Sequence, residues 1–370
     1  MRILLSPDDF KGTLSADDAA RAIATGWRAK RLSDDVLVKP LSDGGPGFVA
    51  AIAASRAVAT RTTTTVHALG GAVEAQWCLA GDTAYLEAAQ VLGLDRGTDI
   101  WHATSCGLAD VLADALAAGA HRIVVGLGGT CVNDGGAGML EGLGAIATAR
   151  AGQPLAVSGD VTQLAMAGAI DLAPARGLFR EVALVAATDV DVPLLGPRGA
   201  THGLAKQKGA TAEDLPMLED ALAAFAAACA RREDGKDASV MLGAGAAGGV
   251  GFALLALGAT RESGFDTVWR ESEIDLAGVD LVITGEGRLD WQSMRGKVVS
   301  GVAKRAQQAG VPVLAIAGDV TITPRERSEM GLDAAYSLTE WFGAERAVQE
   351  PAQCLAEAAT RLVRTWGRLE

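Results

Sequence analysis

A chain of 370 residues is too long for one ordinary hydrophobic core, so its length favours two domains. Its formal net charge of -12 argues against binding to nucleic acid or to an anionic membrane surface, because both need a basic footprint. The five cysteines form no CxxC pair, which excludes a zinc site of that type and indicates a reducing, cytoplasmic setting rather than a disulfide framework.

Strand-like and helix-like segments alternate along the chain. The first predicted strand is followed by a helix whose start is marked by Ser15 and Asp18, at the spacing of a capping box. Another helix is predicted over residues 105–120, where apolar residues recur at helical spacing. The alternation predicts an α/β fold with mostly parallel sheets. Buried strands are predicted, in chain order, at residues 2–6, 36–42, 121–129, 181–190, 279–287 and 311–318.

One stretch interrupts this alternation of strands and helices. From residue 58 to about residue 86, Thr and Val residues with turn glycines indicate antiparallel strands, whereas the pattern of the N-terminus returns from about Val279. We therefore expect two domains, one of them made from both ends of the chain. The predicted domains are a discontinuous, Rossmann-like one of residues 1–68 plus 279–370 and an inserted one of residues 69–278.

The uncharged stretch at residues 238–260 could be an ordinary core segment, a membrane span or part of a dinucleotide-binding site. It is long enough to cross a bilayer, but its Gly and Ala content favours a buried loop and helix, so we expect no membrane partner. Within it, GAGAAG at residues 243–248 matches the GxGxxG of nicotinamide-dependent dehydrogenases. The preceding residues make a poor buried strand, which weakens this alternative. No GxxxxGK[ST] occurs, so the chain is not a Walker-type enzyme.

Several predicted strands end in loops that combine glycine with acidic residues. Glycine lets backbone N–H groups approach an anion, and carboxylates there can hold Mg²⁺ or accept a proton from a hydroxyl. Together these parts suit phosphoryl transfer, although any one loop could simply cap a helix. Lys11 and Lys297 each lie beside glycine where a helix is expected to begin, and an ammonium there can reach phosphate. The loops span residues 7–12, 41–47, 126–138, 188–199 and 284–297.

These loops carry a resemblance that runs over nearly the whole chain. PDDFKGTLSA, PLSDGGPG, GLGGTCVNDGGAGML, TDVDVPLLGPRGAT, QKGAT, GAGAAGGVG and TGEGRLDWQSMRGK resemble, in order, blocks of the type I glycerate kinase family. The resemblance implies phosphorylation of D-glycerate by ATP with Mg²⁺, in this family usually at the 2-hydroxyl. It also implies two α/β domains with the active-site cleft between them. D-glycerate or a similar hydroxy acid and ATP are then the expected partners, and a homodimer is left open.

The resemblance also implies site residues. Arg288 is expected to pair with the substrate carboxylate, because its planar fork does so better than a lysine. One of Asp189, Asp191 and Asp290 would accept the hydroxyl proton or orient the metal, and the sequence leaves open which. The expected catalytic residues are Lys11, Asp189, Asp191, Asp290 and Lys297, with Asp189 and Asp191 also as metal ligands; the expected substrate-binding residues are Asp8, Asp43, Glu286 and Arg288; and the expected nucleotide- or phosphate-binding residues are Gly128, Gly129, Thr130, Asn133, Asp134 and Gly135.

At a few positions the chain departs from the family pattern. Asp9 replaces Ser in the first block, and Pro46 and Phe48 stand where DGGEGT is usual. Val192 replaces Asn, and Trp291 replaces a small residue. The missing carboxylate at Pro46 leaves a second class of function open, a protein that senses glycerate or nucleotide without turnover.

Overall fold

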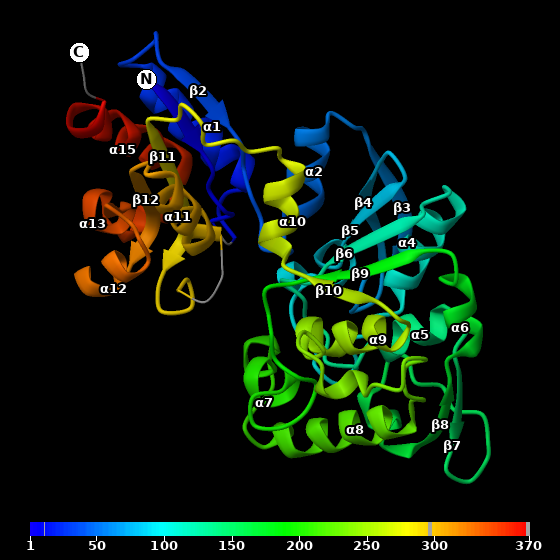
Figure 1. Cartoon of the computed structure of the whole chain (residues 1–370). Coiled ribbons are helices and arrows are strands. Elements are labelled where there is room, and N and C mark those ends of the chain that lie inside the picture. The colour runs from blue at the N-terminus through cyan, green and yellow to red at the C-terminus, as the bar shows by residue number, and fades with distance from the viewer. Residues whose placement is uncertain (11, 295–297, 368–370) are drawn as a thin grey trace. The chain divides into compact units, whose positions relative to one another are not determined.

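The structure is a computed structural model that describes residues 1–10, 12–294 and 298–367 (Figure 1). Contacts between residues divide the chain into two compact units. Unit 1 combines residues 1–43 with residues 265–370, and unit 2 comprises residues 44–264. Two predicted catalytic residues, Lys11 and Lys297, lie outside the described residues.

Unit 1 is built on a sheet of five strands that all run parallel. The first strand pairs with strands from both ends of the chain, since Ile3 is opposite Val36 on one side and Leu281 on the other. Parallel strands buried on both faces need nearly continuous apolar runs, which RILL and LVITG supply. The order is β13-β12-β11-β1-β2, with β1 (Arg2–Leu5), β2 (Asp35–Val38), β11 (Leu281–Leu289), β12 (Val313–Val320) and β13 (Ala334–Ser337).

The helices of unit 1 include a close pair from the two chain ends, α1 and α15. A Cβ added at Gly26 would lie 1.9 Å from the carbonyl oxygen of Ala356, so only glycine allows this approach. Trp27, fully buried, donates from its indole N–H to Asp34 at 2.9 Å. At the start of α1, the hydroxyl of Ser15 accepts a hydrogen bond from Asp18 N, as the sequence predicts. The helices are α1 (Ala16–Arg28), α10 (Gly264–Glu271), α11 (Val298–Ala309), α12 (Pro324–Glu329), α13 (Leu338–Phe342), α14 (Ala344–Gln349) and α15 (Pro351–Trp366).

Unit 2 holds a mixed sheet of six strands and a separate two-stranded sheet. Four strands of the larger sheet, β5, β6, β9 and β10, run parallel, whereas β3, β4 and β5 pair antiparallel. The antiparallel part is the Thr- and Val-rich stretch in which the sequence predicts such strands. The order is β10-β9-β6-β5-β4-β3, with β3 (Thr60–Val66), β4 (Ala72–Ala80), β5 (Thr83–Glu87), β6 (Arg122–Gly126), β9 (Ala183–Ala187) and β10 (Thr260–Glu262); the small sheet pairs β7 (Ile146–Ala149) with β8 (Ala167–Asp171).

The longest helices of unit 2 are α4 and α8, and several shorter helices and 3-10 turns fill the loops (Figure 1). The α/β fold is thus confirmed, with an all-parallel sheet in unit 1 and a mixed sheet in unit 2. The α-helices are α2 (Phe48–Arg56), α3 (Ala89–Leu92), α4 (Gly107–Ala117), α5 (Ala137–Gly142), α6 (Ala173–Leu178), α7 (Ala200–Leu204), α8 (Asp214–Ala228) and α9 (Val250–Ala256). The 3-10 turns are η1 (Leu94–Arg96), η2 (Val161–Met166), η3 (Lys206–Lys208), η4 (Ala238–Val240) and η5 (Ala246–Gly249).

The uncharged stretch at residues 238–260 folds as the loop and buried helix that its composition favours. It forms η4, η5 and α9, and every residue of α9 is buried. Among the described residues, no helix has the length and apolar character needed to cross a membrane. The GAGAAG segment follows η4 rather than a strand, so it lacks the context of a dinucleotide-binding fingerprint. Packing accounts for glycines of this segment, since a Cβ at Gly248 would overlap the carbonyl oxygen of Val132.

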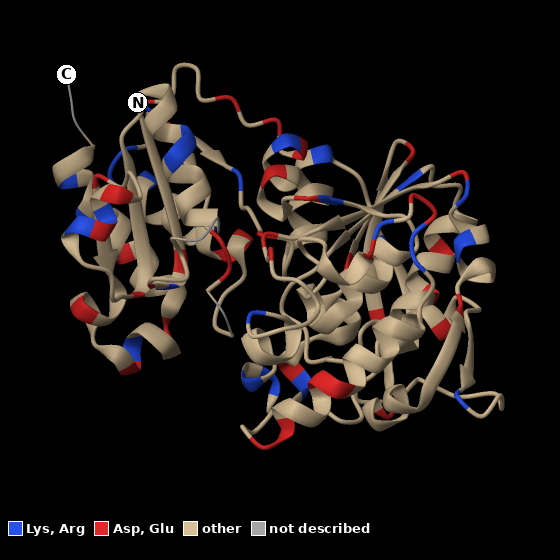
Figure 2. Cartoon of the chain, turned by 60° about the horizontal axis from the view of Figure 1, so that its bottom comes forward, with Lys and Arg blue, Asp and Glu red and all other residues tan. Residues whose placement is uncertain are grey.

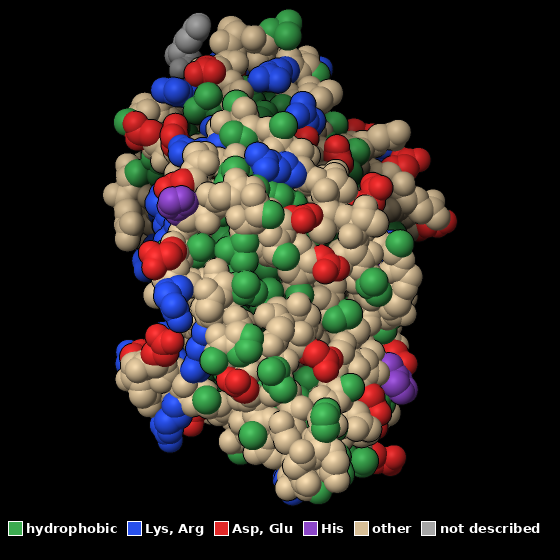
Figure 3. Space-filling view, turned by 90° about the vertical axis from the view of Figure 1, so that its right-hand side faces the viewer, with side chains coloured by type: hydrophobic (Ala, Val, Ile, Leu, Met, Phe, Trp, Pro, Cys, Tyr) green, Lys and Arg blue, Asp and Glu red, His purple; other side chains and the backbone are tan. Residues whose placement is uncertain are grey.

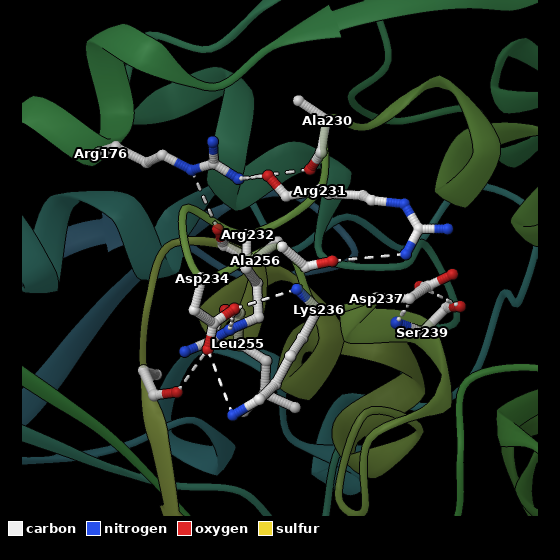
Figure 4. A network of polar contacts seen from close by, with 12 residues as sticks. Arg176, Ala230, Arg231, Arg232, Asp234, Lys236, Asp237, Ser239, Leu255 and Ala256 are labelled. Carbon is white, nitrogen blue, oxygen red and sulfur yellow. Dashed lines mark hydrogen bonds and ion pairs between the residues drawn. The ribbon is translucent and has the colours of Figure 1, made fainter.

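Two arginines satisfy the carbonyl groups at the end of α9 (Figure 4). Arg232 donates from Nη1 to Leu255 O and, at 3.1 Å, to Ala259 O. Arg176 donates from Nε to Ala256 O at 3.1 Å. The last carbonyls of a helix have no partner within it, and a buried helix end cannot turn to water instead. These guanidinium groups therefore stabilise the end of a helix that lies wholly inside unit 2.

The observed division of the chain differs from the predicted domain boundaries at residues 68 and 279. Residues 44–68 belong to unit 2, because β3 pairs with β4 along its whole length and α2 lies against β4 and β5. Residues 265–278 belong to unit 1. There Arg305 of α11 donates to Asp266 at 2.7 Å and stacks on Phe265. Pairing between distant segments, which local sequence pattern does not report, sets both boundaries.

Charged and apolar side chains are spread over the surface. Asp and Glu lie on helices and loops of both units, with Lys and Arg interspersed (Figure 2). On the face shown in Figure 3, hydrophobic side chains reach the surface at many points among polar ones. Exposed large hydrophobic residues include Ile146 and Met166, each 57% exposed. Scattered exposure of this kind is ordinary for a folded protein and indicates no particular partner.

Candidate active site

The carboxyl ends of three neighbouring strands of unit 1 bring predicted site residues together. Asp8 follows β1, Glu286 and Arg288 lie near the end of β11, and β12 ends beside them, with Arg288 opposite Asp319. A backbone hydrogen bond holds the loop after β1 against β11, since Asp8 N donates to Gly285 O at 2.8 Å. These loops enclose a cavity of about 330 Å³. Among the described residues, its charged lining consists of Asp8, Asp9, Glu286, Arg288, Asp290 and Asp319.

Arg288 is the cation among these lining residues, and it is loosely held. Its side chain is 64% exposed, and its Nε lies 3.9 Å from Asp290 Oδ2, longer than a hydrogen bond. Asp290 is instead fixed by the loop, where its Oδ1 accepts from Gln292 N at 2.8 Å. A guanidinium without a close carboxylate partner can form the paired hydrogen bonds that a ligand carboxylate offers. The position of Arg288 therefore suits the role predicted for it.

The carboxylates around the cavity repel one another. Burial raises the pKa of Asp8 well above its ordinary value, and the nearby charges of Asp43, Asp9 and Glu286 raise it further. The hydrogen bond from Asp9 N at 2.9 Å lowers this pKa and so works in the opposite direction. Asp43, which follows β2, thus belongs to the same acidic group although it does not line the cavity. Such a group favours a bound proton or a cation, and it would disfavour an anion unless Arg288 or another cation compensates.

In unit 2 the predicted residues follow parallel strands β6 and β9, whose carboxyl ends are neighbours. Gly126 is opposite Ala187, so the loop after β6 and the turn at Asp189 lie at one edge of the sheet. Thr188, fully buried, shapes that turn. Its hydroxyl donates to Leu127 O at 3.3 Å and accepts from Val190 N at 3.1 Å. Asp189 is half-buried and Asp191 is exposed, so both can be reached from outside the unit.

The glycines at this edge are explained largely by packing. A Cβ at Gly126 would lie 2.6 Å from Gly44 O, and one at Gly128 would lie 2.7 Å from Gly45 Cα. These loops approach backbone to backbone, which requires glycine whether or not an anion binds. Gly129 has φ +65° and is exposed, so its backbone is open to a ligand. The phosphate-binding role of this loop stays a prediction.

Asp134 is committed to contacts inside unit 2. Its Oδ2 accepts from Ser105 N at 2.8 Å and Ser105 Oγ at 2.7 Å, and its Oδ1 accepts from Gly136 N at 3.0 Å. Asp134 and Asn133 are both buried, as are Thr130 and Gly135. A nucleotide could therefore reach Gly128 and Gly129 more readily than the buried members of the predicted set.

Glu87, at the end of β5 beside the glycine loop, is not among the site residues that the sequence predicts. It is 5% exposed, and its Oε2 accepts from Val49 N at 3.2 Å at the start of α2. Burial raises the pKa of Glu87 to about 7, and hydrogen bonds from the backbone of Val49, Gly47 and Phe48 and from Gln90 oppose that rise. An acid at the end of a buried strand, in TAYLE, was the available signal.

Buried Lys208, which lies in the QKGAT block, was also overlooked. It is 3% exposed. A lysine beside glycine is expected at the surface, so the sequence did not indicate that this side chain is buried. A further residue outside the predicted set, Asp319, lines the cavity of unit 1.

Two departures from the family pattern pack inside unit 2. Phe48 is fully buried, and its ring centroid lies 6.3 Å from that of Tyr85. Val192 is half-buried, and its carbonyl accepts from Gly245 N at 3.0 Å. Trp291, in contrast, is 57% exposed in unit 1. Phe48 thus packs in the interior of unit 2.

The oxygen donors of the loops decide whether a metal ion such as Mg²⁺ could bind. Across residues 1–10, 12–294 and 298–367, no group of three or more His, Cys, Asp or Glu side chains is arranged to hold a metal ion. Mg²⁺ in phosphoryl-transfer sites is commonly held by one or two carboxylates, with waters and substrate phosphates completing its coordination. Asp189 and Asp191 supply hard oxygen donors of that kind, so these residues fit such a metal ion.

Comparison with known proteins identifies the family. A model described as "Glycerate kinase family" matches residues 3–367. The chain belongs to the glycerate kinase family. It is 36% identical to a glycerate kinase of Halalkalibacterium halodurans over 99% of each chain, and 36% identical to glycerate 2-kinase of Escherichia coli K12 over 93% of this chain and 92% of that one. A solved structure of a candidate glycerate kinase 2 from Salmonella typhimurium LT2 superposes with a TM-score of 0.79 and 34% identity, covering 99% of this chain and 98% of that chain.

Proposed function

We propose that this glycerate kinase family member transfers the γ-phosphoryl group of ATP to the 2-hydroxyl of D-glycerate and releases 2-phosphoglycerate. The observation that carries the proposal is the family match over residues 3–367, together with a full-length likeness to a relative named glycerate 2-kinase. The acidic cavity of unit 1 and the glycine-rich edge of unit 2 support it, because phosphoryl transfer depends on positioning and charge neutralisation.

In unit 1 the proposed ligand is glycerate. Arg288 binds the carboxylate through two parallel hydrogen bonds, and its exposure leaves the guanidinium accessible. Asp8, Asp43 and Glu286 accept hydrogen bonds from the substrate hydroxyls. Lys11 and Lys297 are proposed to offset the charge of the phosphoryl group and of these carboxylates.

In unit 2 the proposed ligand is the triphosphate of ATP. The backbone N–H groups of Gly128 and Gly129 face the phosphates, while Thr130, Asn133, Asp134 and Gly135 give the loop its shape. Asp189 and Asp191 would hold Mg²⁺, which when bound neutralises phosphate charge. The general base is one of Asp189, Asp191 and Asp290.

The test measures both products of the reaction. Purified protein with ATP, MgCl₂ and D-glycerate should release ADP, and enolase added afterwards should convert the second product to phosphoenolpyruvate, which absorbs in the ultraviolet. No ADP release with glycerate would refute the kinase. ADP release without an enolase signal would keep the kinase but refute the 2-phosphate. Full turnover in excess EDTA would refute the metal requirement.

A ligand sensor remains the competing class, and the same preparation distinguishes it. Glycerate or ATP would then raise the melting temperature of the protein while no ADP appears. The dehydrogenase alternative loses its support, because GAGAAG does not follow a strand in the structure.

A further inference from the structure

A buried lysine lies against the predicted phosphate loop of unit 2. Lys208 ends the 3-10 turn η3, is 3% exposed, and donates from Nζ to the backbone carbonyl of Val132 at 2.7 Å. An ammonium has three hydrogens to donate, and this is the one hydrogen bond that it forms with the part of the chain that the structure describes. No carboxylate of the described residues forms an ion pair with it.

The groups facing Lys208 compensate its charge only in part, since the Asp134 carboxylate attracts the ammonium without forming an ion pair with it. Its titratable neighbours are Cys131 and Asp134. Burial raises the pKa of the Cys131 thiol to about 11, so this group is uncharged near neutral pH. The carboxylate of Asp134 is occupied by Ser105 and by backbone N–H groups of the loop. A buried charge without a close counterion is expensive, and a Met or Leu side chain would pack in similar space at less cost.

The loop next to Lys208 is held at successive points. Cys131 N donates to Leu92 O at 2.8 Å, Val132 O accepts from Lys208, and Gly135 N donates to Gly248 O at 3.0 Å. Between these anchors, Asn133 donates from Nδ2 to Thr201 Oγ1 at 3.3 Å, and its fully buried Oδ1 receives no hydrogen bond from any described residue. The ammonium thus adjoins a segment whose polar groups are not all satisfied.

We propose that Lys208 is a positioning residue for nucleotide binding: its ammonium holds Val132 O by a hydrogen bond, so that the backbone N–H groups of Gly128 and Gly129 stay in place for phosphate. A positive charge beneath an anion-binding loop also favours the anion directly, and more strongly in a dry interior than in water. This inference rests on the proposed binding of ATP to the glycine-rich edge of unit 2.

The pH dependence separates this role from a purely structural one. Burial lowers the pKa of Lys208 from its ordinary value to about 8. The ammonium is therefore largely intact at pH 7 and loses its proton as the pH rises past 8. A neutral amine still donates a hydrogen bond, but a weaker one. The KM for ATP of the unaltered enzyme should accordingly rise across this range.

The experiment compares two variants with a matched control. Lys208→Met keeps the length of the side chain without a donor, and Lys208→Gln keeps a neutral donor. Lys206→Met alters the exposed lysine two positions earlier in η3. Each protein is tested for the KM of ATP and of glycerate, for the melting temperature with and without ATP, and at several pH values from 7 to 9.

We expect Lys208→Met to raise the KM for ATP about tenfold or more, since charged hydrogen bonds contribute most among such contacts. Lys208→Gln should fall between it and the unaltered enzyme. The KM for glycerate should change less than about twofold, and the rise in KM for ATP above pH 8 should be absent from Lys208→Met. Lys206→Met should match the unaltered enzyme throughout.

An unchanged KM for ATP in Lys208→Met, or the same pH dependence in that variant, would overturn the proposal. A lower melting temperature with normal kinetics in the folded fraction would show that Lys208 serves stability alone. If the unaltered protein released no ADP, the kinase function itself would fail. The ATP-induced shift in melting temperature would then still decide whether Lys208 supports nucleotide binding.

Discussion

The carboxyl edges of the two sheets differ in how their polar groups are arranged. In unit 1, carboxylates converge on a cavity, and Asp8 is held at a raised pKa by burial and by Asp43, Asp9 and Glu286. In unit 2, loops meet backbone to backbone, and Asp134 is surrounded by hydrogen-bond donors. At the edge of unit 1 the carboxylates still repel one another, and a bound cation could relieve that repulsion. At the edge of unit 2, close packing and hydrogen bonds already hold the loops.

The contrast indicates how each edge would contribute to catalysis. A rigid loop with aligned N–H groups binds an anion without reorganising, which is how preorganised sites lower a barrier. A cluster of like charges instead tunes protonation and attracts cations, because each carboxylate raises the pKa of the next. Substitutions at the two edges should therefore fail in different ways.

The largest effect is expected from Asp189→Asn in unit 2. If Asp189 is the base or a metal ligand, kcat should fall by roughly a hundredfold or more, with smaller changes in both KM values. Steady-state kinetics at saturating MgCl₂ measure this, and Asp191→Asn shows whether the neighbouring carboxylate shares the task. Near-normal turnover, with a stability loss of about 1 kcal/mol, would mean that Asp189 only caps a turn.

A loss of stability without a loss of catalysis is expected at the end of α9. Arg232→Met removes the side-chain donor to both carbonyls; Leu255 O keeps the backbone donor Gly258 N, whereas Ala259 O loses its Arg232 hydrogen bond, which should lower the free energy of unfolding by about 2 kcal/mol. Urea denaturation measures it. The exposed neighbour Arg231, whose Nη1 reaches Gly235 O at 3.4 Å, provides the control Arg231→Met, which should be near neutral. Equal losses in the two variants would contradict the capping role of Arg232.

A change in substrate binding alone is expected from Arg288→Lys in unit 1. The charge remains but the paired geometry is lost, so the KM for glycerate should rise about tenfold while that for ATP changes little. Arg325→Lys, on the 88% exposed side chain of α12, controls for a general effect of the substitution. A KM for glycerate that stays the same would remove Arg288 from the substrate site.

The smallest effect concerns the acidic cluster. A carboxyl whose pKa is raised by folding stabilises the protein below its unfolded pKa, and this contribution is lost as the pH rises through the folded value. Asp8→Asn should therefore gain stability relative to the unaltered protein at pH 8 but not at pH 4, by about 1 kcal/mol or more. Melting temperatures at both pH values test it, with exposed Asp35→Asn as the control. A gain of equal size at both pH values would show that folding does not raise the pKa of the Asp8 carboxyl.

The predicted strands at residues 2–6, 36–42, 121–129, 181–190, 279–287 and 311–318 all overlap strands of the structure. Parallel strands buried on both faces produce continuous apolar runs, which are visible in a single sequence. β10 was missed because its three residues, TRE, are polar and lie at the edge of the sheet. β13, AAYS, is likewise a short edge strand with little pattern.

For the candidate site, loop identity was predictable and burial was not. Glycines and acids at the ends of apolar runs mark the loops, and in unit 1 they lead to Glu286, Arg288 and Asp290 around one cavity. Lys208 and Glu87 were not predicted as site residues, because charged side chains are expected at the surface and nothing nearby in the sequence indicates that these two are buried.

The sequence by itself determined which segments become buried strands, where the chemistry-bearing loops begin, and to which family the chain is similar. These properties depend on residues close together along the chain. Tertiary structure alone decided that β3 joins unit 2, that Asp43 acts on Asp8, and that the ammonium of Lys208 lies under Val132. Strand order and burial depend on contacts between residues far apart in the chain, and so do pKa shifts, because a charge responds to its neighbours in space.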